Sequence, residues 1–285
     1  MKRSFILALF GLLLFPFALV AQIPVKFHNE VTDTIRINQI LTAHGGERGG
    51  SLLTALGREF LDVPYVASTL EGNDPEILVV NLDEMDCTTF VETVMALAST
   101  IEEGRSSWRD FIFNLQNIRY RGGRPDGYAS RLHYISDWVV DNTHRGNFRE
   151  VTADSPLATY EVKTLDFMTQ NRQLYPALSA DNVFQAMKNA EIGYRNHRFP
   201  VIKDTKIGRA AKDFLREGDI VALTSRKKGL DVSHLGIITL IDGEPYLLHA
   251  SASGGKVIVD PLPLTRYVTK NRLPGIRVIR LPQYR

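Results

Sequence analysis

The segment 233–251 reads SHLGIITLIDGEPYLLHAS and has the pattern of a β-hairpin. Two apolar runs flank Asp242-Gly243, a dipeptide that favours the tight turn of a β-hairpin. His234 stands at the start of the first run and His249 at the end of the second, so antiparallel pairing places the two positions close together. We therefore expect a hairpin that brings the two imidazoles side by side, within hydrogen-bonding reach.

The chain around this hairpin has helices first and strands afterwards. A polar lead-in occupies residues 22–50, a helix capped by Ser51 follows, and a second helix begins at Asp86 with apolar residues at helical spacing. Strands are expected at 219–224, 234–241, 245–251, 256–260 and 276–281. This order predicts an α+β fold with an antiparallel sheet, a single domain over residues 22–285, and a long, mostly helical insertion at about 105–215.

Composition and charge exclude several classes of protein. Hydrophobic residues make up 44% and charged residues 23% of the 285 positions, which is typical of a globular protein and excludes a disordered or fibrous chain. The formal net charge is +2, and Lys2 and Arg3 at the extreme N-terminus supply both excess positive charges. The rest of the chain is neutral, so we expect no nucleic-acid partner, because such binding depends on an excess of basic residues.

Residues 1–21 have the layout of a secretory signal peptide. Two basic residues precede an apolar run from Phe5 to Val20, and Ala21 is a small residue suited to cleavage before Gln22. The alternative is an uncleaved N-terminal anchor. We expect an exported protein with no stable membrane insertion after cleavage.

Cys87 is the one cysteine of the chain, which is informative because an oxidising compartment favours paired cysteines. Such a residue is either buried and inert or a free reactive thiol. Its position just after Asp86, at the expected start of a helix, favours a lowered thiol pKa through the helix dipole and the free N–H groups. Residues 71–103 oppose this effect, since they hold nine acidic side chains and no Lys or Arg. A thiolate here therefore requires an imidazolium partner, for which His234 and His249 are the candidates.

The motifs around these residues resemble those of the NlpC-type papain-like cysteine hydrolases of bacterial cell walls. The matching segments, in the family's order, are DCT at 86–88, GDIV at 218–221, SHLGI at 233–237 and LHAS at 248–251. Tyr65 matches the family's tyrosine upstream of the nucleophile. Thr88 and Thr89 replace the Ser-Gly that generally follows the Asp-Cys pair, and His234 stands much farther from Cys87 than in compact members.

At both of these points the sequence resembles one branch of the superfamily, the N-acetylmuramoyl-L-alanine amidase-like proteins formerly classed as a domain of unknown function. This resemblance implies a papain-like NlpC-type fold, with the nucleophile at a helix N-terminus packed on an antiparallel sheet, in a protein of the Gram-negative periplasm. It implies hydrolysis of the amide between N-acetylmuramic acid and L-alanine in peptidoglycan, without a cofactor. Because the sequence shows no separate wall-binding repeat, we expect soluble peptidoglycan fragments, the muropeptides, as substrates. By the same resemblance Cys87 is the nucleophile, His234 the base, His249 the residue that orients His234, and Tyr65 part of the oxyanion site.

The predicted insertion offers candidate substrate-binding residues. Tyr128, Arg131 and His133 combine aromatic faces that suit a sugar ring with an Arg fork that suits a carboxylate. The alternative is a helix that packs its aromatic residues inward. His133 and Asp137 stand four residues apart, as two metal ligands on a helix do, but two ligands do not make a site and no metal is expected.

Two other functions remain open. An endopeptidase of the same superfamily would cut between D-glutamate and diaminopimelate in the stem peptide. The long insertion argues against this function, because it would reshape the sugar-facing side of the cleft. A catalytically silent wall-binding protein could use the same scaffold, but such a protein has no need of a free thiol at Cys87 together with His234 and His249.

Overall fold

The structure is a computed structural model that describes residues 24–282, so the predicted signal peptide lies outside the described residues. The α-helices are α1 (Glu30–Ala43), α2 (Gly49–Arg58), α3 (Cys87–Glu102), α4 (Trp108–Arg119), α5 (Ile135–Arg145), α6 (Phe167–Gln170), α7 (Asp181–Ile192), α8 (Ile207–Asp213) and α9 (Leu264–Lys270). The strands are β1 (Val25–Phe27), β2 (Leu78–Val80), β3 (Arg149–Glu150), β4 (Thr159–Lys163), β5 (His197–Lys203), β6 (Ile220–Thr224), β7 (Val232–Ile241), β8 (Glu244–Ser251), β9 (Lys256–Pro263) and β10 (Gly275–Arg280). Within residues 24–282, no helix combines the length and the apolar character needed to cross a bilayer.

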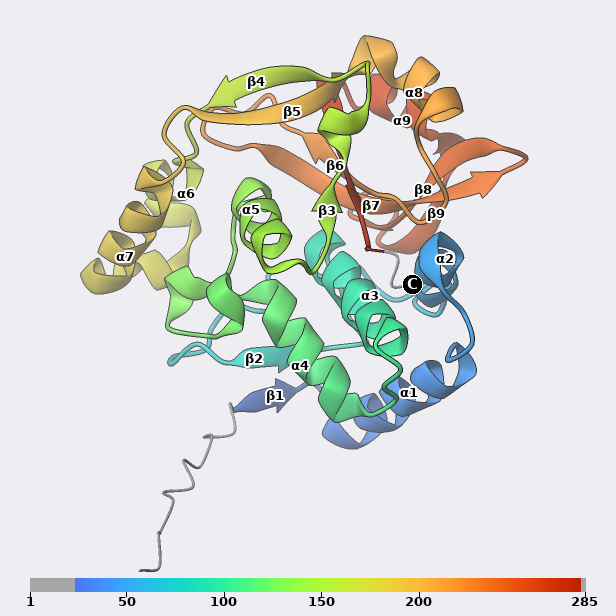
Figure 1. The fold of residues 1–285 in the computed structure, drawn as a ribbon. Coiled ribbons are helices and arrows are strands. Elements are labelled where there is room, and N and C mark those ends of the chain that lie inside the picture. Colours follow the sequence, from blue (N-terminus) through green and yellow to red (C-terminus); the bar gives the residue numbers. More distant parts are fainter. Residues whose placement is uncertain (1–23, 283–285) are drawn as a thin grey trace, which may run out of the picture.

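An eight-stranded antiparallel sheet forms the centre of the fold (Figure 1). Its strand order is β4-β5-β10-β6-β7-β8-β9, and β3 pairs with β10. The five strands expected in the C-terminal part are all present, with ends within three residues of those expected. Asp242 and Gly243 have φ values of 51° and 79°, the left-handed conformation that the tight turn between β7 and β8 requires. The predicted α+β class with an antiparallel sheet is confirmed.

Helices cover both faces of this sheet because its strands alternate between two apolar cores. Ile237 and Leu248 pack with α2 and α3 in one core, whereas their neighbours Ile238 and Leu247 pack with α8 and α9 in the other. Figure 1 shows α3 lying across the middle of the molecule and α8 and α9 on the opposite side of the sheet. The start of α3 is thereby held against the central strands.

One expectation for the N-terminal part is wrong, and two elements there were not expected. The polar lead-in contains β1 and α1, and Asn29 caps α1 by accepting a hydrogen bond from the Thr32 N–H. Helix α2 begins at Gly49 and not after Ser51. The Gly49 N–H donates to the Glu102 carboxylate at 2.7 Å, so a residue at the end of α3 replaces the local cap that a sequence pattern detects.

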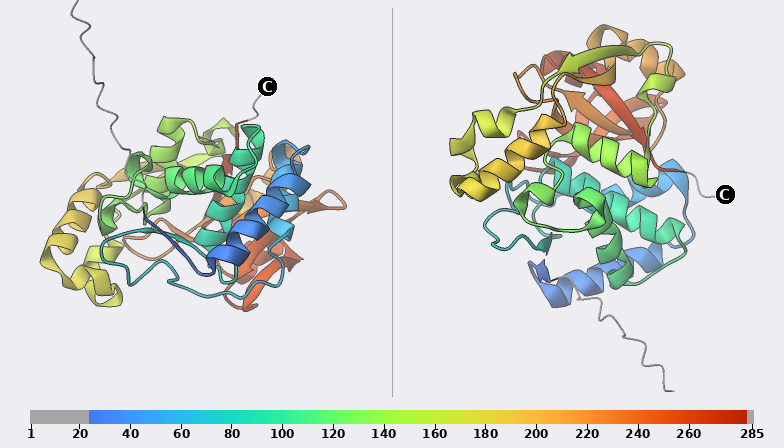
Figure 2. Two further views of the ribbon diagram at one scale, coloured as in Figure 1. Left: turned by 90° about the horizontal axis from the view of Figure 1, so that it is seen from below. Right: turned by 60° about the vertical axis from the view of Figure 1, so that its left-hand side comes forward.

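The segment 105–215 is less helical than expected. It contains α4 to α8 but also contributes β3, β4 and β5, and the last two extend one end of the central sheet. Helices α6 and α7 form a lobe beside the sheet, visible at the edge of both views in Figure 2. A small apolar core holds this lobe together through Leu165, Met168, Leu178 and Met187.

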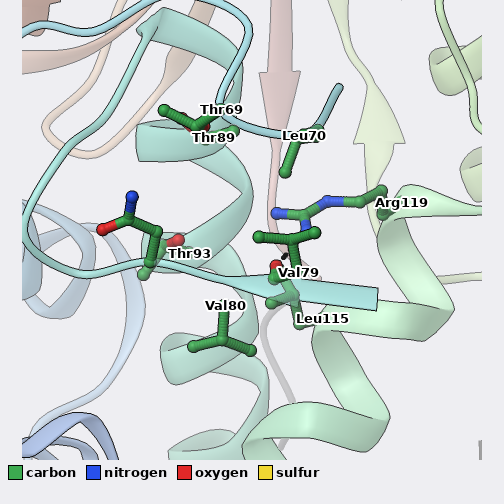
Figure 3. Close-up of a pocket in the computed structure, with 9 residues that line it drawn as sticks. Thr69, Leu70, Val79, Val80, Thr89, Thr93, Leu115 and Arg119 are labelled. Carbon is green, nitrogen blue, oxygen red and sulfur yellow. Dashed lines mark hydrogen bonds between the residues drawn. The ribbon is translucent and has the colours of Figure 1, made fainter. Parts of the chain in front are cut away.

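A buried ion pair joins β2, α3 and α4. The Arg119 Nε lies 2.6 Å from the Glu92 Oε2, and each side chain is only 3% exposed. Arg119 also donates to the Val79 carbonyl at 2.6 Å, at a small pocket lined by residues of these three elements and of the loop before β2 (Figure 3). Burial raises the pKa of Glu92, and the charge of Arg119 opposes that rise. Arg119 therefore compensates for the free-energy cost of burying the Glu92 carboxylate under the first turns of α3.

We expect Arg119→Ala to lower the free energy of unfolding by about 3–5 kcal/mol, because it leaves a buried carboxylate without its partner. Urea denaturation followed by circular dichroism measures this loss. Arg209→Ala is the matched control, since Arg209 pairs with Asp213 on the surface, with side chains 72% and 64% exposed, and should cost less than about 1 kcal/mol. Equal losses in the two variants would contradict the assigned role of the buried pair.

Candidate active site

Cys87 is the first residue of α3, as the sequence predicts, and the backbone before it fixes this position. Asp86 is the N-cap, and its carboxylate accepts hydrogen bonds from the N–H groups of Thr88 and Thr89 at 3.0 and 2.8 Å. The Asp86 N–H in turn donates to the Thr89 hydroxyl at 2.9 Å, which completes a capping box. The Asp86 carboxylate thereby satisfies two neighbouring N–H groups of the first turn.

The two histidines meet as the hairpin predicts. His234 on β7 and His249 on β8 are diagonal neighbours across the strand pair, in a register that aligns Ile237 with Leu248. The His234 Nε2 lies 2.6 Å from the His249 Nδ1, and the two rings stand nearly perpendicular at 84°. Because His234 uses its Nε2 for this bond, its Nδ1 is the ring nitrogen left for another partner.

The sulfur of Cys87 lies beside the start of β7. The backbone N–H of Leu235, the residue after His234, is close enough to the Cys87 side chain to lower the pKa of the thiol. Burial raises the pKa of Tyr65 and of Tyr267, and a negative charge on Cys87 would raise both further, so the two phenols lie near the sulfur. Three of the predicted catalytic elements, namely the helix start, the hairpin and the upstream tyrosine, are therefore grouped in one region.

Tyr65 owes its position to the backbone on both sides of it. Its N–H donates to the carbonyl of Gly255, in the turn between β8 and β9, at 2.8 Å. The next residue, Val66, donates to the carbonyl of Met85 at 3.1 Å, and Met85 donates back to the Pro64 carbonyl at 3.0 Å. Since Met85 directly precedes Asp86, the loop that carries Tyr65 is tied to the segment that leads into α3.

The ionisation of the site differs from that expected for a helix N-terminus. Burial, and then the charge of Asp86, raise the pKa of the Cys87 thiol to about 11, although the nearby Leu235 N–H opposes the rise. Burial lowers the pKa of His234 to about 4, and burial together with His234 lowers that of His249 to about 3. Near pH 7 the thiol and both imidazoles are therefore neutral, and the expected lowering of the thiol pKa is wrong in sign because burial and the acidic neighbour outweigh the helix dipole.

Two further residues belong to this region and were not predicted from the sequence. The Asp260 Oδ2 on β9 lies 3.5 Å from the His249 Nε2. The Tyr267 ring on α9 lies 5.5 Å from the His249 ring and 6.5 Å from the His234 ring. Asp260 stands two residues beyond Ile258, the β9 partner of His249, so extending the strand count past the second turn would have placed it on the face of His249.

The three residues predicted to bind substrate form one cluster. The Arg131 guanidinium lies 2.7 Å from the Glu71 carboxylate and 4.9 Å from the centre of the Tyr128 ring. The Tyr128 and His133 rings are 4.5 Å apart, and the His133 Nε2 bonds to the Tyr128 carbonyl at 2.9 Å. Tyr128 and Arg131 are buried, at 8% and 6% exposure, so much of this cluster packs inward. Contact between these residues and a substrate stays a prediction.

His133 and Asp137 do not meet as metal ligands. The Asp137 carboxylate accepts two hydrogen bonds from Arg121, at 2.7 and 2.6 Å, and one from the Tyr194 hydroxyl at 2.7 Å. Residues 24–282 contain no cluster of three or more His, Cys, Asp or Glu side chains that could hold a metal ion.

Comparisons with known proteins identify the family of the chain. The model of the AmiA-like family, described as N-acetylmuramoyl-L-alanine amidase-like, matches residues 55–276. A comparison with curated proteins gives no significant match.

Several solved structures share the fold. An N-acetylmuramoyl-L-alanine amidase from Bacteroides uniformis is 39% identical with a TM-score of 0.78, and the match covers 82% of this chain and 99% of that one. A protein from Bacteroides fragilis described as a candidate xylanase is 40% identical with a TM-score of 0.75, over 80% of this chain and 99% of that one. A protein from Legionella pneumophila, 19% identical with a TM-score of 0.68 over 89% and 96% of the two chains, shares the fold alone.

Because Cys87 is the one cysteine of the chain, alkylation by iodoacetamide reports its ionisation directly. With the thiol pKa raised to about 11, the alkylation rate should rise about tenfold per pH unit from pH 7 to pH 9, since only the thiolate reacts. His234→Ala should follow nearly the same profile. A rate that is flat between pH 6 and pH 9 in the unmodified protein, and that loses this plateau in His234→Ala, would instead demonstrate a thiolate–imidazolium pair.

Proposed function

The chain belongs to the AmiA-like, N-acetylmuramoyl-L-alanine amidase-like family, and on that premise we propose that it hydrolyses the amide between N-acetylmuramic acid and L-alanine in muropeptides by a cysteine mechanism. One observation carries the mechanism. The His234–His249 hydrogen bond of 2.6 Å lies next to Leu235, whose N–H is close enough to Cys87, at the start of α3, to lower the pKa of the thiol. In this proposal α3 supplies the nucleophile, β7 the base and β8 the group that orients the base.

Acylation begins with a neutral thiol. The Cys87 Sγ attacks the lactyl carbonyl carbon, and its proton passes to the free Nδ1 of His234 in the same step, because the raised thiol pKa keeps little thiolate in the resting site. The tetrahedral intermediate then breaks its C–N bond. His234 returns the proton to the departing amine of L-alanine, which leaves a thioester between Cys87 and the muramyl group.

The developing oxyanion needs donors that are already in place. We assign this role to the Cys87 backbone N–H, at a helix N-terminus, and to the Tyr65 hydroxyl, whose pKa burial raises so that it stays a donor. Water then attacks the thioester with His234 as base. This step releases the muramyl carboxylate and restores the thiol.

The substrate-binding part of the proposal concerns the 120–134 segment. We propose that Tyr128, Arg131 and His133 form the sugar-facing wall of the cleft. Because Arg131 already pairs with Glu71, a substrate carboxylate would have to compete with that partner, whereas an uncharged sugar would not.

We also propose that the mature protein acts in the periplasm of a Gram-negative bacterium, as the signal-like residues 1–21 suggest.

Two rival activities receive less support. A xylanase would need two carboxyl groups flanking the bond to be cut. Asp86 and Asp260 are the carboxylates beside the cysteine and histidines, and both are engaged, the first as the cap of α3 and the second as acceptor of the Leu262 N–H at 2.8 Å. The D-glutamyl-diaminopimelate endopeptidase would use the same catalytic groups, so product analysis must distinguish it.

Mass spectrometry of a defined disaccharide-tetrapeptide incubated with the mature protein tests the activity. We expect free disaccharide and intact tetrapeptide, with turnover abolished in Cys87→Ala because no nucleophile remains. A product in which L-alanine stays attached to the sugar would move the assignment to the endopeptidase. Absence of any cleavage by the unmodified protein would contradict both.

Tyr65→Phe tests the proposed oxyanion site, because it removes only the hydroxyl group of Tyr65. We expect kcat to fall about 10²- to 10³-fold with little change in KM, because the lost hydrogen bond forms mainly in the transition state. Tyr160→Phe is the control, since Tyr160 lies on β4 with 52% of its surface exposed. Full activity in Tyr65→Phe would remove Tyr65 from the mechanism.

A further inference from the structure

His249 has a buried ring nitrogen that the proposed mechanism does not use. Its side chain is 1% exposed, and its Nδ1 bonds to His234. Among the described residues, its Nε2 has no hydrogen-bond partner at ordinary distance. The nitrogen faces the Asp260 carboxylate, whose Oδ2 lies 3.5 Å away and whose side chain is 12% exposed.

Asp260 is held so that one oxygen is fixed and the other faces His249. Its Oδ1 accepts a hydrogen bond from the Leu262 N–H at 2.8 Å, where β9 leads into α9. The Tyr267 ring lies against both imidazoles, so α9 covers the three groups from the side. The only charge in direct contact with His249 among the described residues is therefore the Asp260 carboxylate.

The hydrogen bond between the two histidines allows two arrangements of protons. If His234 donates from Nε2, its Nδ1 is unprotonated and His249 carries its own proton on Nε2. If His249 donates from Nδ1, its Nε2 is unprotonated and His234 carries its proton on Nδ1. Only the first arrangement leaves His234 able to accept a proton through Nδ1, and only the first places an N–H, and not a lone pair, against the Asp260 carboxylate.

We propose that Asp260 is a positioning residue that fixes the tautomers of both histidines and so prepares the Nδ1 of His234 to accept the proton of Cys87. This inference rests on the proposed cysteine mechanism. In this proposal Asp260 acts through His249 and not on the substrate. Its charge orients the dipole of His249, and His249 passes that orientation to His234.

Asp260→Asn tests the proposal with the smallest change of shape. The Leu262 N–H still needs an oxygen, so the amide oxygen takes the place of Oδ1 and the NH₂ group takes the place of Oδ2. An N–H donor then faces the His249 Nε2 and favours the inactive arrangement. We expect kcat to fall about 10³- to 10⁴-fold with little change in KM. Asp242→Asn is the control, because Asp242 is exposed and its left-handed turn position accepts Asn.

Nitrogen-15 NMR of the histidine rings reads the tautomers without any substrate. In the unmodified protein we expect both His234 and His249 to carry the proton on Nε2, and in Asp260→Asn we expect His249 to carry it on Nδ1. A proton on Nδ1 of His249 in the unmodified protein would overturn the proposal even if the variant fails to fold. Full activity in Asp260→Asn would also overturn it, whereas inactivity of the unmodified protein with the expected tautomers would overturn the proposed amidase function alone.

Discussion

The register of the β7–β8 hairpin is the constraint on which the candidate site depends. Side chains alternate between the two faces of a strand, so a slip of one residue would move His249 to the other face and separate it from His234. The left-handed conformations of Asp242 and Gly243 fix the two-residue turn, and the turn fixes the register. The 2.6 Å bond between the imidazoles follows directly from this local geometry. The helix that carries Cys87 then needs only to pack on the same strands.

The resting site is arranged around neutral groups. Burial holds the thiol of Cys87 and the imidazoles of His234 and His249 in their uncharged forms, while Asp86 and Asp260 stand at the two ends of the group. Such a site would separate charge only when a substrate is present and the thiol proton moves to His234. A thiol with a raised pKa is also oxidised less readily, because the thiolate is the reactive species. That property suits a free cysteine in a protein that we propose to be exported.

Local patterns predicted the site better than they predicted the surrounding fold. The Asp86 cap and the Asp242-Gly243 turn act within a few residues, so the sequence places Cys87, His234 and His249 correctly on their elements. The start of α2 depends on Glu102, from the far end of another helix, and no local pattern carries that information. Strands β4 and β5 also depend on distant parts of the chain, because they form by pairing at the end of the sheet. The direction of the shift in the thiol pKa likewise depends on burial in the folded protein, which no local pattern shows.

The mass of the acyl-enzyme identifies both the nucleophile and the bond that is cut in one spectrum. The protein is mixed with a disaccharide-tetrapeptide, quenched in acid within the first turnover, and digested to locate the modified residue. We expect a thioester on Cys87 that carries the disaccharide and its lactyl group and no amino acid. An adduct on Cys87 that retains L-alanine and D-glutamate, or rapid turnover with Cys87 unmodified, would contradict it.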